Sequence, residues 1–256
     1  MGPFPFRRTA LVGAETLEYV LAGQGPARVV LIGGAGAPIE GWHKVFDGIA
    51  SFATVLAYNR PGLGGSSAPA APQTGLHLVG SLRGLLQSAG VAPPWVLVAH
   101  SFGGLIANLL ARHHPDEVAA VVMVEATAPD DPFTMARHEN RLQRGLKALL
   151  DRLLPQHPAN EVRHVATTVA QLQAAPPFPA VPLTVITGQA PAMAWATPAE
   201  ALRLRAMHQR SLATLSPHGR QVLAHRSGHF PQFSEPALLI AEVREAIEAA
   251  AARPAR

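Results

Sequence analysis

The sequence predicts an α/β fold, in which a mostly parallel central sheet carries helices on both faces and a helical cap is inserted into the chain. Short continuous apolar runs alternate with longer segments of helical periodicity, the pattern of strands buried on both faces and joined by crossover helices. The stretch from Thr127 to Pro182 has no clear strand and interrupts this alternation. We therefore expect an α/β core, residues 1–126 and 183–256, and a helical cap insertion, residues 127–182.

The core begins with two short strands within Thr9–Ala22, which form an antiparallel pair around a turn at Gly13-Ala14. The alternation of strands and helices follows. A helix over Thr74–Ala89 is expected because its apolar residues recur at helical spacing. The remaining core elements before the insertion are strands Arg28–Ile32, Thr54–Tyr58, Trp95–Ala99 and Val118–Val124, with a helix over Leu105–Arg112.

Two helices are expected in the cap insertion. Four leucines lie along one helical stripe, and four further apolar residues predict a second helix: Leu142, Leu146, Leu149 and Leu153, then Val162, Val165, Val169 and Leu172. The chain then returns to the core with strands Leu183–Thr187 and Gln221–Ala224 and a last helix from about Ala237 to Ala250.

Composition excludes several classes of function. The net charge of +4 comes almost wholly from scattered arginines, and aromatic residues make up only 5% of the chain, so we expect no nucleic-acid partner. The chain has no cysteine, which excludes disulfides, thiol catalysis and thiolate metal sites. Nothing in the sequence requires a metal or another cofactor.

The sequence favours a cytoplasmic location. Arg7-Arg8 resembles a twin-arginine signal, but Glu15 and Glu18 break the apolar run that such a signal needs. No stretch approaches the ~18 apolar residues of a membrane span, so we expect no stable membrane insertion. The oligomeric state is not indicated.

Ser101 is the candidate nucleophile. It lies in Ala99-His100-Ser101-Phe102-Gly103, between an apolar strand and a helix. A sharp strand-to-helix turn exposes a serine hydroxyl and requires small neighbours, as in the pattern G-x-S-x-G. Ala99 replaces the first glycine of that pattern, so the strand before the serine and the helix after it carry the prediction. The alternative is a serine that caps an ordinary helix.

His229 is the candidate general base. It follows the last expected strand in Ser227-Gly228-His229-Phe230, just before the final helix. None of the other eleven histidines occupies that loop after a glycine. His100 adjoins the serine, but a neighbouring side chain on the turn points the wrong way, so it is expected to be a pocket or packing residue.

Three motifs in this order resemble the α/β-hydrolase superfamily: AHSFGG around Ser101, YNRPGLGGS over Tyr58–Ser66, and SGHF around His229. The resemblance covers nearly the whole chain apart from the cap. It implies the α/β-hydrolase fold, a serine nucleophile and the chain order serine, acid, histidine.

The acid departs from the commonest family pattern. Family members often carry an Asp after the strand that follows the cap, but here Gly188-Gln189-Ala190-Pro191 offers no carboxylate. Glu125, at the end of Val118–Val124, occupies the alternative family position and would orient the imidazole of the base. Asp130, Asp131 or a Ser–His dyad remain alternatives.

The backbone N–H groups of Phe102 and Ala35 are the candidate oxyanion-hole donors, with Gly34 a near alternative. Ala35 lies in Gly33-Gly34-Ala35-Gly36, directly after a strand. A dinucleotide-binding reading of this loop fails, because the third glycine is missing, Pro38 falls where a helix should begin, and Asn59 replaces the expected acid.

The function predicted from these residues is a carboxylesterase-like serine hydrolase that acts on a small-molecule ester or related carbonyl compound through an acyl-enzyme. His100, Trp42 and Trp195 are candidate pocket residues, and they favour a substrate with an apolar acyl or aromatic part. Two alternatives remain. One is a lyase or a cofactor-free oxygenase or perhydrolase of the same fold, and the other is a non-catalytic ligand-binding protein on this scaffold.

Overall fold

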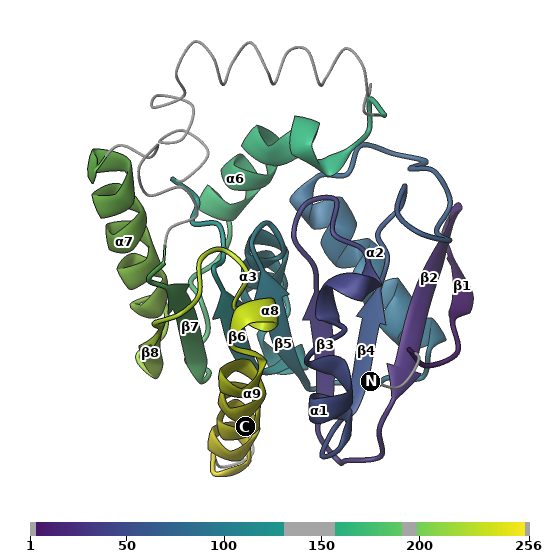
Figure 1. Ribbon diagram of the computed structural model, residues 1–256. Coiled ribbons are helices and arrows are strands. Elements are labelled where there is room, and N and C mark those ends of the chain that lie inside the picture. Colours follow the sequence, from purple (N-terminus) through teal and green to yellow (C-terminus); the bar gives the residue numbers. More distant parts are fainter. Residues whose placement is uncertain (1–3, 131–156, 191–198, 254–256) are drawn as a thin grey trace.

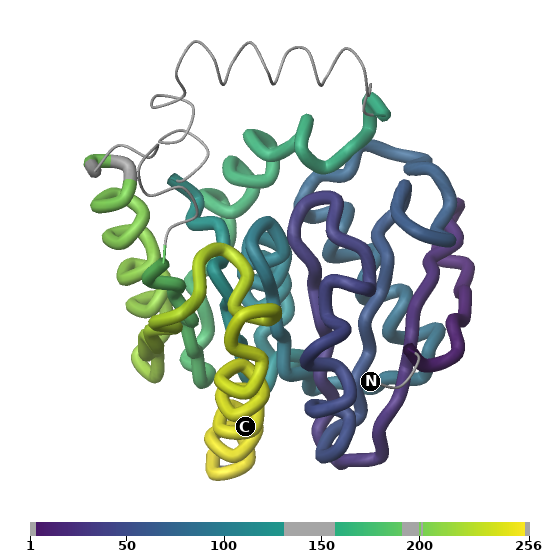
Figure 2. The backbone as a smooth tube through the Cα atoms, in the orientation of Figure 1, coloured from purple at the N-terminus to yellow at the C-terminus, as the bar shows by residue number. Residues whose placement is uncertain are grey.

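A single eight-stranded sheet organises the computed structural model, which describes residues 4–130, 157–190 and 199–253 (Figure 1). The strand order is β1-β2-β4-β3-β5-β6-β7-β8. Strand β2 runs antiparallel to both of its neighbours, and the strands from β4 to β8 are parallel. The strands are β1 Arg8–Val12, β2 Glu15–Ala22, β3 Arg28–Ile32, β4 Thr54–Tyr58, β5 Trp95–His100, β6 Val118–Val124, β7 Leu183–Gly188 and β8 Gly219–Ala224. Figure 2 shows the purple N-terminal hairpin at one edge of the sheet and the green β8 at the other.

Helices cover both faces of this sheet. The α-helices are α1 Phe46–Ala50, α2 Gly75–Ser88, α3 Gly103–His113, α6 Val165–Gln173, α7 Ala199–Ala213, α8 Pro231–Ser234 and α9 Pro236–Ala251. Short 3-10 helices are η1 Ile39–Trp42, η2 Pro115–Glu117 and η3 Glu161–His164. Within the part of the chain described, no helix is long and apolar enough to cross a membrane.

The core consists of two apolar clusters, one on each face of the sheet. Alternate residues of β3 show the division, since Val30 and Ile32 belong to one cluster while Val29 and Leu31 belong to the other. The first cluster is completed by α2, α3 and α6, and the second by α1 and α9. Because side chains of a strand alternate between faces, a strand covered on both faces must be apolar throughout. The continuous apolar runs of the sequence are therefore explained.

The predicted α/β-hydrolase fold is confirmed by this architecture. Strands β3, β4 and β6 have the predicted bounds, and β5, β7 and β8 extend the predictions by one or two residues. Helix α7 was not predicted. Of the two expected cap helices, the second corresponds to η3 and α6, which packs against α2 and α3 (Figure 1). The stripe Leu142, Leu146, Leu149 and Leu153 lies outside the described residues, and the division into core and cap stays a prediction.

Candidate active site

Ser101 occupies the sharp turn between β5 and α3, with a positive φ of 51°. Such a backbone conformation is rare for residues other than glycine, and here neighbouring hydrogen bonds hold it. The carbonyl of Ser101 accepts from the N–H groups of Gly104 (2.9 Å) and Thr127 (3.0 Å), and its own N–H donates to Val124 (3.2 Å). The turn therefore presents the serine hydroxyl at the carboxyl end of β5.

Small residues around Ser101 allow the turn to sit against the sheet. A Cβ at Gly103 would lie only 2.4 Å from the carbonyl oxygen of Ile32, so a side chain does not fit there. Position 99, where the pattern G-x-S-x-G has its first glycine, does have room for a side chain. Ala99 is fully buried inside β5 between Ile32 and Met123, and its methyl group is accommodated in the core. The alanine in place of glycine is thus compatible with the elbow.

His229 lies beside the serine hydroxyl. Its Nε2 is 3.1 Å from Ser101 Oγ, although the two residues are 128 positions apart in the sequence. The loop that carries His229 leads from β8 into α8 and then α9. A Cβ at Gly188 would lie 2.1 Å from the carbonyl oxygen of Gly228, so the end of β7 must be a glycine for this loop to approach. An imidazole at this distance can accept the hydroxyl proton.

Glu125 lies on the other side of the imidazole. Its Oε2 is 3.4 Å from His229 Nδ1, and its Oε1 accepts the backbone N–H of Gly188 at 2.7 Å. The carboxylate is fully buried, and the residue has a positive φ of 46° at the end of β6. The structure therefore brings Ser101, His229 and Glu125 together in the order that a triad requires. Of the alternative acids, Asp130 is exposed and Asp131 lies outside the described residues.

Arg205 of α7 is a neighbour of the acid that the sequence did not reveal. Its Nη2 forms an ion pair with Oε2 of Glu125, the same oxygen that faces His229. Burial lowers the pKa of Arg205, but an arginine side chain stays charged at neutral pH. The buried carboxylate thus has a cationic partner besides the imidazole, which favours its ionised form.

The candidate oxyanion donors lie in two segments that meet at Ser101. Position 34 is closely packed, since a Cβ there would lie 3.1 Å from the Cβ of Ser101. Within the described part of the chain, the backbone N–H groups of Phe102 and Ala35 have no protein acceptor. Phe102 begins the turn into α3, and Ala35 is exposed at the tip of its loop. Both groups are therefore available to a substrate.

A buried ion pair supports the loop of residues 33–36, which we call the oxyanion loop. Arg60, which follows β4, donates to the carbonyl oxygens of Gly33 (2.8 Å) and Gly34. Its guanidinium also binds the carboxylate of Glu161, from η3. Burial opposes the charge of Arg60, but the adjacent carboxylate outweighs it and raises the pKa of the guanidinium above its usual value. The contact of Glu161 with this loop was not predicted from the sequence.

His100 is buried rather than open to a pocket. Its Nε2 lies 2.7 Å from the carbonyl oxygen of His229, and its ring contacts the rings of His229 and Phe230. Burial lowers its pKa to about 4, so the ring is neutral at pH 7. A carbonyl oxygen only accepts hydrogen bonds, so the proton of the neutral ring must be on Nε2. His100 thus ties the nucleophile strand to the loop of the base.

Trp42 and Trp195 were both predicted to line the pocket, and the structure describes Trp42. Trp42 of η1 is buried, and its ring meets that of His100 edge-on, with 6.5 Å between centroids. It therefore packs behind His100. Trp195 lies outside the described residues. No cluster of three or more His, Asp or Glu side chains suited to a metal ion occurs in the ranges that the structure describes.

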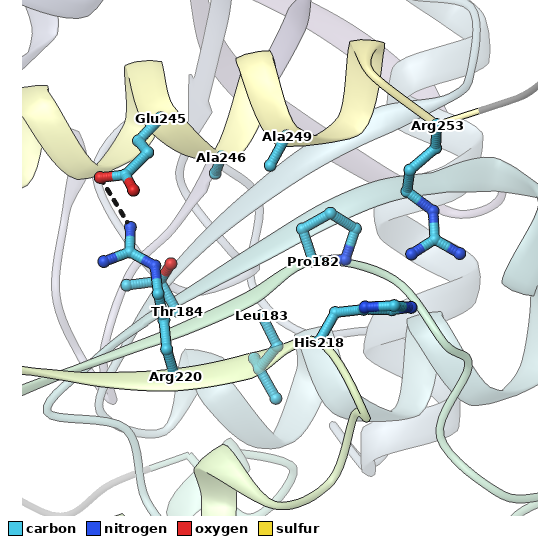
Figure 3. Close-up of a pocket in the computed structure, with 9 residues that line it drawn as sticks. All are labelled: Pro182, Leu183, Thr184, His218, Arg220, Glu245, Ala246, Ala249 and Arg253. Atoms are coloured by element: carbon cyan, nitrogen blue, oxygen red, sulfur yellow. Dashed lines mark ion pairs between the residues drawn. The ribbon is translucent and has the colours of Figure 1, made fainter.

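A separate cavity of about 270 Å³ lies at the opposite end of the sheet, where β7 and β8 begin (Figure 3). Its lining includes His218, Arg220 and Glu245. Arg220 Nη2 lies 3.0 Å from Glu245 Oε2, so this cation is paired within the cavity wall. Ser101 follows the carboxyl end of a parallel strand, and the cavity is therefore remote from the candidate triad.

Comparison with known proteins relates the chain to a fold family and to several hydrolases. The family described as alpha/beta hydrolase fold matches residues 27–241. The lipase LipV of Mycobacterium tuberculosis is 39% identical over 103 residues, which are 40% of this chain and 38% of LipV. The protein YqjL of Bacillus subtilis is 28% identical over 130 residues, 50% of this chain and 51% of YqjL. The matched segments thus span about half the length of these curated relatives, or less.

The similarity to solved structures extends over most of the chain. The enol-lactonase from Burkholderia xenovorans superposes with a TM-score of 0.69 and 23% identity, and the match covers 94% of this chain and all of the lactonase. At this level of identity the likeness shows a shared fold. The family match includes Ser101, Glu125 and His229, all within residues 27–241.

Proposed function

Because the chain belongs to the alpha/beta hydrolase fold family, we propose that it is a serine hydrolase that cleaves ester bonds of small molecules, with Ser101, His229 and Glu125 as its catalytic triad. The observation that carries this proposal is the 3.1 Å distance between His229 Nε2 and Ser101 Oγ, at a serine held in the strained turn after β5. A nucleophile within hydrogen-bond reach of its base is the arrangement that covalent catalysis requires.

In the acylation step, Ser101 Oγ attacks the carbonyl carbon of the ester while its proton passes to His229 Nε2. The resulting imidazolium is stabilised by Glu125, whose Oε2 faces Nδ1 at 3.4 Å. The tetrahedral intermediate then collapses, the carbon–oxygen bond to the leaving group breaks, and the leaving alcohol takes the proton from Nε2. The acyl group remains on Ser101.

Negative charge develops on the carbonyl oxygen during this attack. The N–H groups of Phe102 and Ala35, which have no acceptor in the described part of the chain, would donate to that oxygen. Water then attacks the acyl carbon while His229 takes its proton. The bond between this carbon and Ser101 Oγ breaks, Oγ takes the proton back from His229, and the acid product leaves. In this proposal the nucleophile, the base, the acid and the oxyanion donors are all side chains or backbone groups of this chain.

An ester is favoured over other carbonyl substrates because two of the similar proteins are a lipase and an enol-lactonase. Lipases and lactonases both open bonds between an acyl carbon and an oxygen. The fluoroacetate dehalogenase of a Burkholderia species is also a relative, 31% identical over 124 residues. Dehalogenases of this fold use an Asp where Ser101 stands, so its reaction is not favoured here.

A covalent probe tests the nucleophile directly. We expect a fluorophosphonate to add one adduct to the folded protein, located on Ser101 by mass spectrometry of its peptides. Turnover of p-nitrophenyl esters should fall at least about 10³-fold in Ser101→Ala, because a triad acts as a unit. Ser51→Ala is the matched control, since its exposed hydroxyl donates to the Gly48 carbonyl far from the site. An unlabelled Ser101, or turnover that survives its loss, would contradict the proposal.

A further inference from the structure

We propose that Glu161 is a positioning residue of the oxyanion hole: together with Arg60 it fixes the oxyanion loop, residues 33–36, and so sets the rate of the chemical step. This inference rests on the proposed function and deepens it. Glu161 lies within the predicted cap insertion, whereas the candidate triad lies at the ends of core strands. A residue of the insertion would then act on the chemistry, and not only on substrate access.

Arg60 orients the oxyanion loop through the carbonyl groups of the loop. The carbonyl groups of Gly33 and Gly34 both accept from the Arg60 guanidinium. In a trans peptide unit the C=O group and the following N–H group point in opposite directions. Holding these two carbonyls therefore turns the N–H groups of Gly34 and Ala35 away from Arg60. Ala35 is the candidate oxyanion donor of this loop, and Gly34 is its near alternative.

Arg60 also lies beside Phe102, the residue that carries the other candidate oxyanion donor. Its guanidinium carbon lies 5.7 Å from the centre of the Phe102 ring, and Phe102 supplies the second candidate donor. The cation is thus in contact with both segments whose N–H groups must converge on one oxygen. Since these groups act only through their placement, a small displacement of Arg60 would affect both donors.

The position and the charge of the Arg60 guanidinium depend in turn on Glu161. The two side chains are 1% and 2% exposed, so water cannot solvate either charge. Glu161 Oε2 accepts from Arg60 Nε at 2.5 Å, and Oε1 accepts from Nη2 at 2.9 Å. A fork of two parallel hydrogen bonds fixes the plane of a guanidinium as well as its charge. Without Glu161, the cation would be buried and uncompensated.

Glu161 also contacts the oxyanion loop itself. Its Oε1 accepts the backbone N–H of Gly36 at 2.9 Å. This glycine has a positive φ of 65°, so the hydrogen bond holds a turn of the loop that most residues could not adopt. One carboxylate therefore fixes the loop at both ends, directly at Gly36 and through Arg60 at Gly33 and Gly34.

The test compares Glu161→Gln with Glu117→Gln. Gln keeps the shape of the side chain but removes the charge. Glu117 is a matched control, because it binds Arg83 through the same two-bond fork (2.7 and 2.6 Å) on the surface, away from the site. We expect kcat for p-nitrophenyl esters to fall about 10- to 100-fold in Glu161→Gln, somewhat less than loss of a whole oxyanion donor. KM should change less than about twofold, because the loop acts at the transition state. Glu117→Gln should keep both constants.

Hydrogen exchange of the loop amides separates this inference from the proposed function. We expect the peptide covering residues 33–37 to exchange about tenfold faster in Glu161→Gln, since a charged acceptor is replaced by a neutral one. Unchanged exchange would overturn the inference in an active or an inactive protein. Faster exchange with unchanged kcat would overturn its catalytic part. Faster exchange in a protein that neither binds fluorophosphonate nor cleaves esters would support the positioning and refute the hydrolase.

A second variant covers the case in which Glu161→Gln does not fold. Arg60→Met combined with Glu161→Met removes both charges together, which buried ion pairs often tolerate without loss of stability. This double variant lacks every donor that Arg60 gives to the loop. A folded double variant with wild-type kcat and wild-type exchange in residues 33–37 would overturn the inference, whereas reduced kcat at unchanged KM would support it.

Discussion

Ser101 and Glu125 share a strained backbone conformation, with φ of 51° and 46°. Each follows a buried strand, and the two turns are joined, because the N–H of Thr127 donates to the carbonyl of Ser101. The turn at Glu125 is held in the same way, since its own N–H donates to Ile186 at 2.9 Å. Strain of this kind persists only where the surroundings impose it. The nucleophile and the candidate acid are therefore positioned by one connected set of backbone bonds.

Replacement of Glu125 by Gln tests the acid. The Gln oxygen can keep the Gly188 N–H bond, but its amide would face His229 Nδ1 and favour the wrong tautomer. We expect kcat to fall about 10²- to 10⁴-fold with little change in KM. Glu242→Gln is the control, since it also removes a charge paired with an arginine, Arg220, away from the site. Turnover near that of the wild type in Glu125→Gln would exclude Glu125 as the acid.

Stability should depend on pH through His100. Burial lowers its pKa to about 4, against 6.5 in the unfolded chain. The unfolded state therefore takes up the proton first as pH falls, so this contribution is complete above pH 6.5 and is lost between pH 6.5 and 4. It amounts to at most about 3 kcal/mol. Urea unfolding at pH 7 and pH 4.5 should show a smaller difference in free energy for His100→Gln than for the wild type.

The exposed His43 provides the control for that experiment. His43→Gln should keep the wild-type difference between the two pH values, because other groups that titrate in this range are present in all three proteins. If His100→Gln also kept the full difference, the low pKa of the buried ring would be wrong.

The residue types of the candidate triad could be predicted from the sequence, but two residues that support the site, Arg205 and Glu161, could not. Ser101 and His229 stand at recognisable places in the order of elements, and Glu125 ends a strand. Arg205 and Glu161 act through contacts with residues far away in the chain, as the 101 positions between Arg60 and Glu161 illustrate. Neither lies in a local pattern that indicates its partner. Such contacts require the folded structure.

At the scale of elements, the strands were predictable because burial on both faces leaves a continuous apolar run. Strand β6, Val118–Val124, is an example in which six of the seven residues are buried. Helix α7 carries a weaker signal. Arginines interrupt its apolar positions, and among its described side chains the contacts with the core clusters are made by Leu212 and Ala213. A helix packed through so few apolar residues shows no clear stripe, so periodicity could not reveal it.

Two glycine substitutions in neighbouring helices should have opposite effects. In Gly103→Ala the new Cβ would lie 2.4 Å from the Ile32 carbonyl oxygen, which is backbone and cannot easily move. We expect a loss of about 1–3 kcal/mol in the free energy of unfolding. We also expect kcat to fall, because the start of α3, which follows Ser101, must shift. In Gly80→Ala, within α2, the Cβ would meet no atom within 4 Å.

Gly80→Ala should therefore stabilise the protein by about 0.5–1 kcal/mol, the difference in helix propensity between the two residues. Its kcat should match that of the wild type. Urea unfolding and ester hydrolysis of both variants check this pair of expectations. Equal stability of the two variants would show that the close approach of α3 to β3 is not a constraint.

At the scale of the whole molecule, the two apolar clusters are separated only by the sheet that both of them cover. Leu105 of α3 is fully buried in one cluster and Leu239 of α9 in the other. We expect Leu105→Ala and Leu239→Ala each to cost about 2–5 kcal/mol, as buried leucines do. Each should shift one common unfolding transition, because strands with side chains in both clusters cannot unfold on one face alone.

Circular dichroism and tryptophan fluorescence should then give coincident urea transitions in both variants, with slopes like that of the wild type. Leu76→Ala is the control, since this leucine of α2 is partly exposed and its loss should cost little. Separate transitions for the two probes would mean that the faces of the sheet unfold independently.

The end of β7 lies against the carboxylate of Glu125, since the Gly188 N–H donates to Oε1 at 2.7 Å. Two adjacent strands thus end beside the same carboxylate, which Glu125 supplies directly after β6. The side chain of Gln189, the first residue after β7, is exposed and lies beside His225, with 2.5 Å between Gln189 Oε1 and His225 Nδ1. Strand β6 therefore supplies the candidate acid and β7 supplies a backbone donor that holds it, so the placement of this carboxylate depends on the parallel pairing of the two strands.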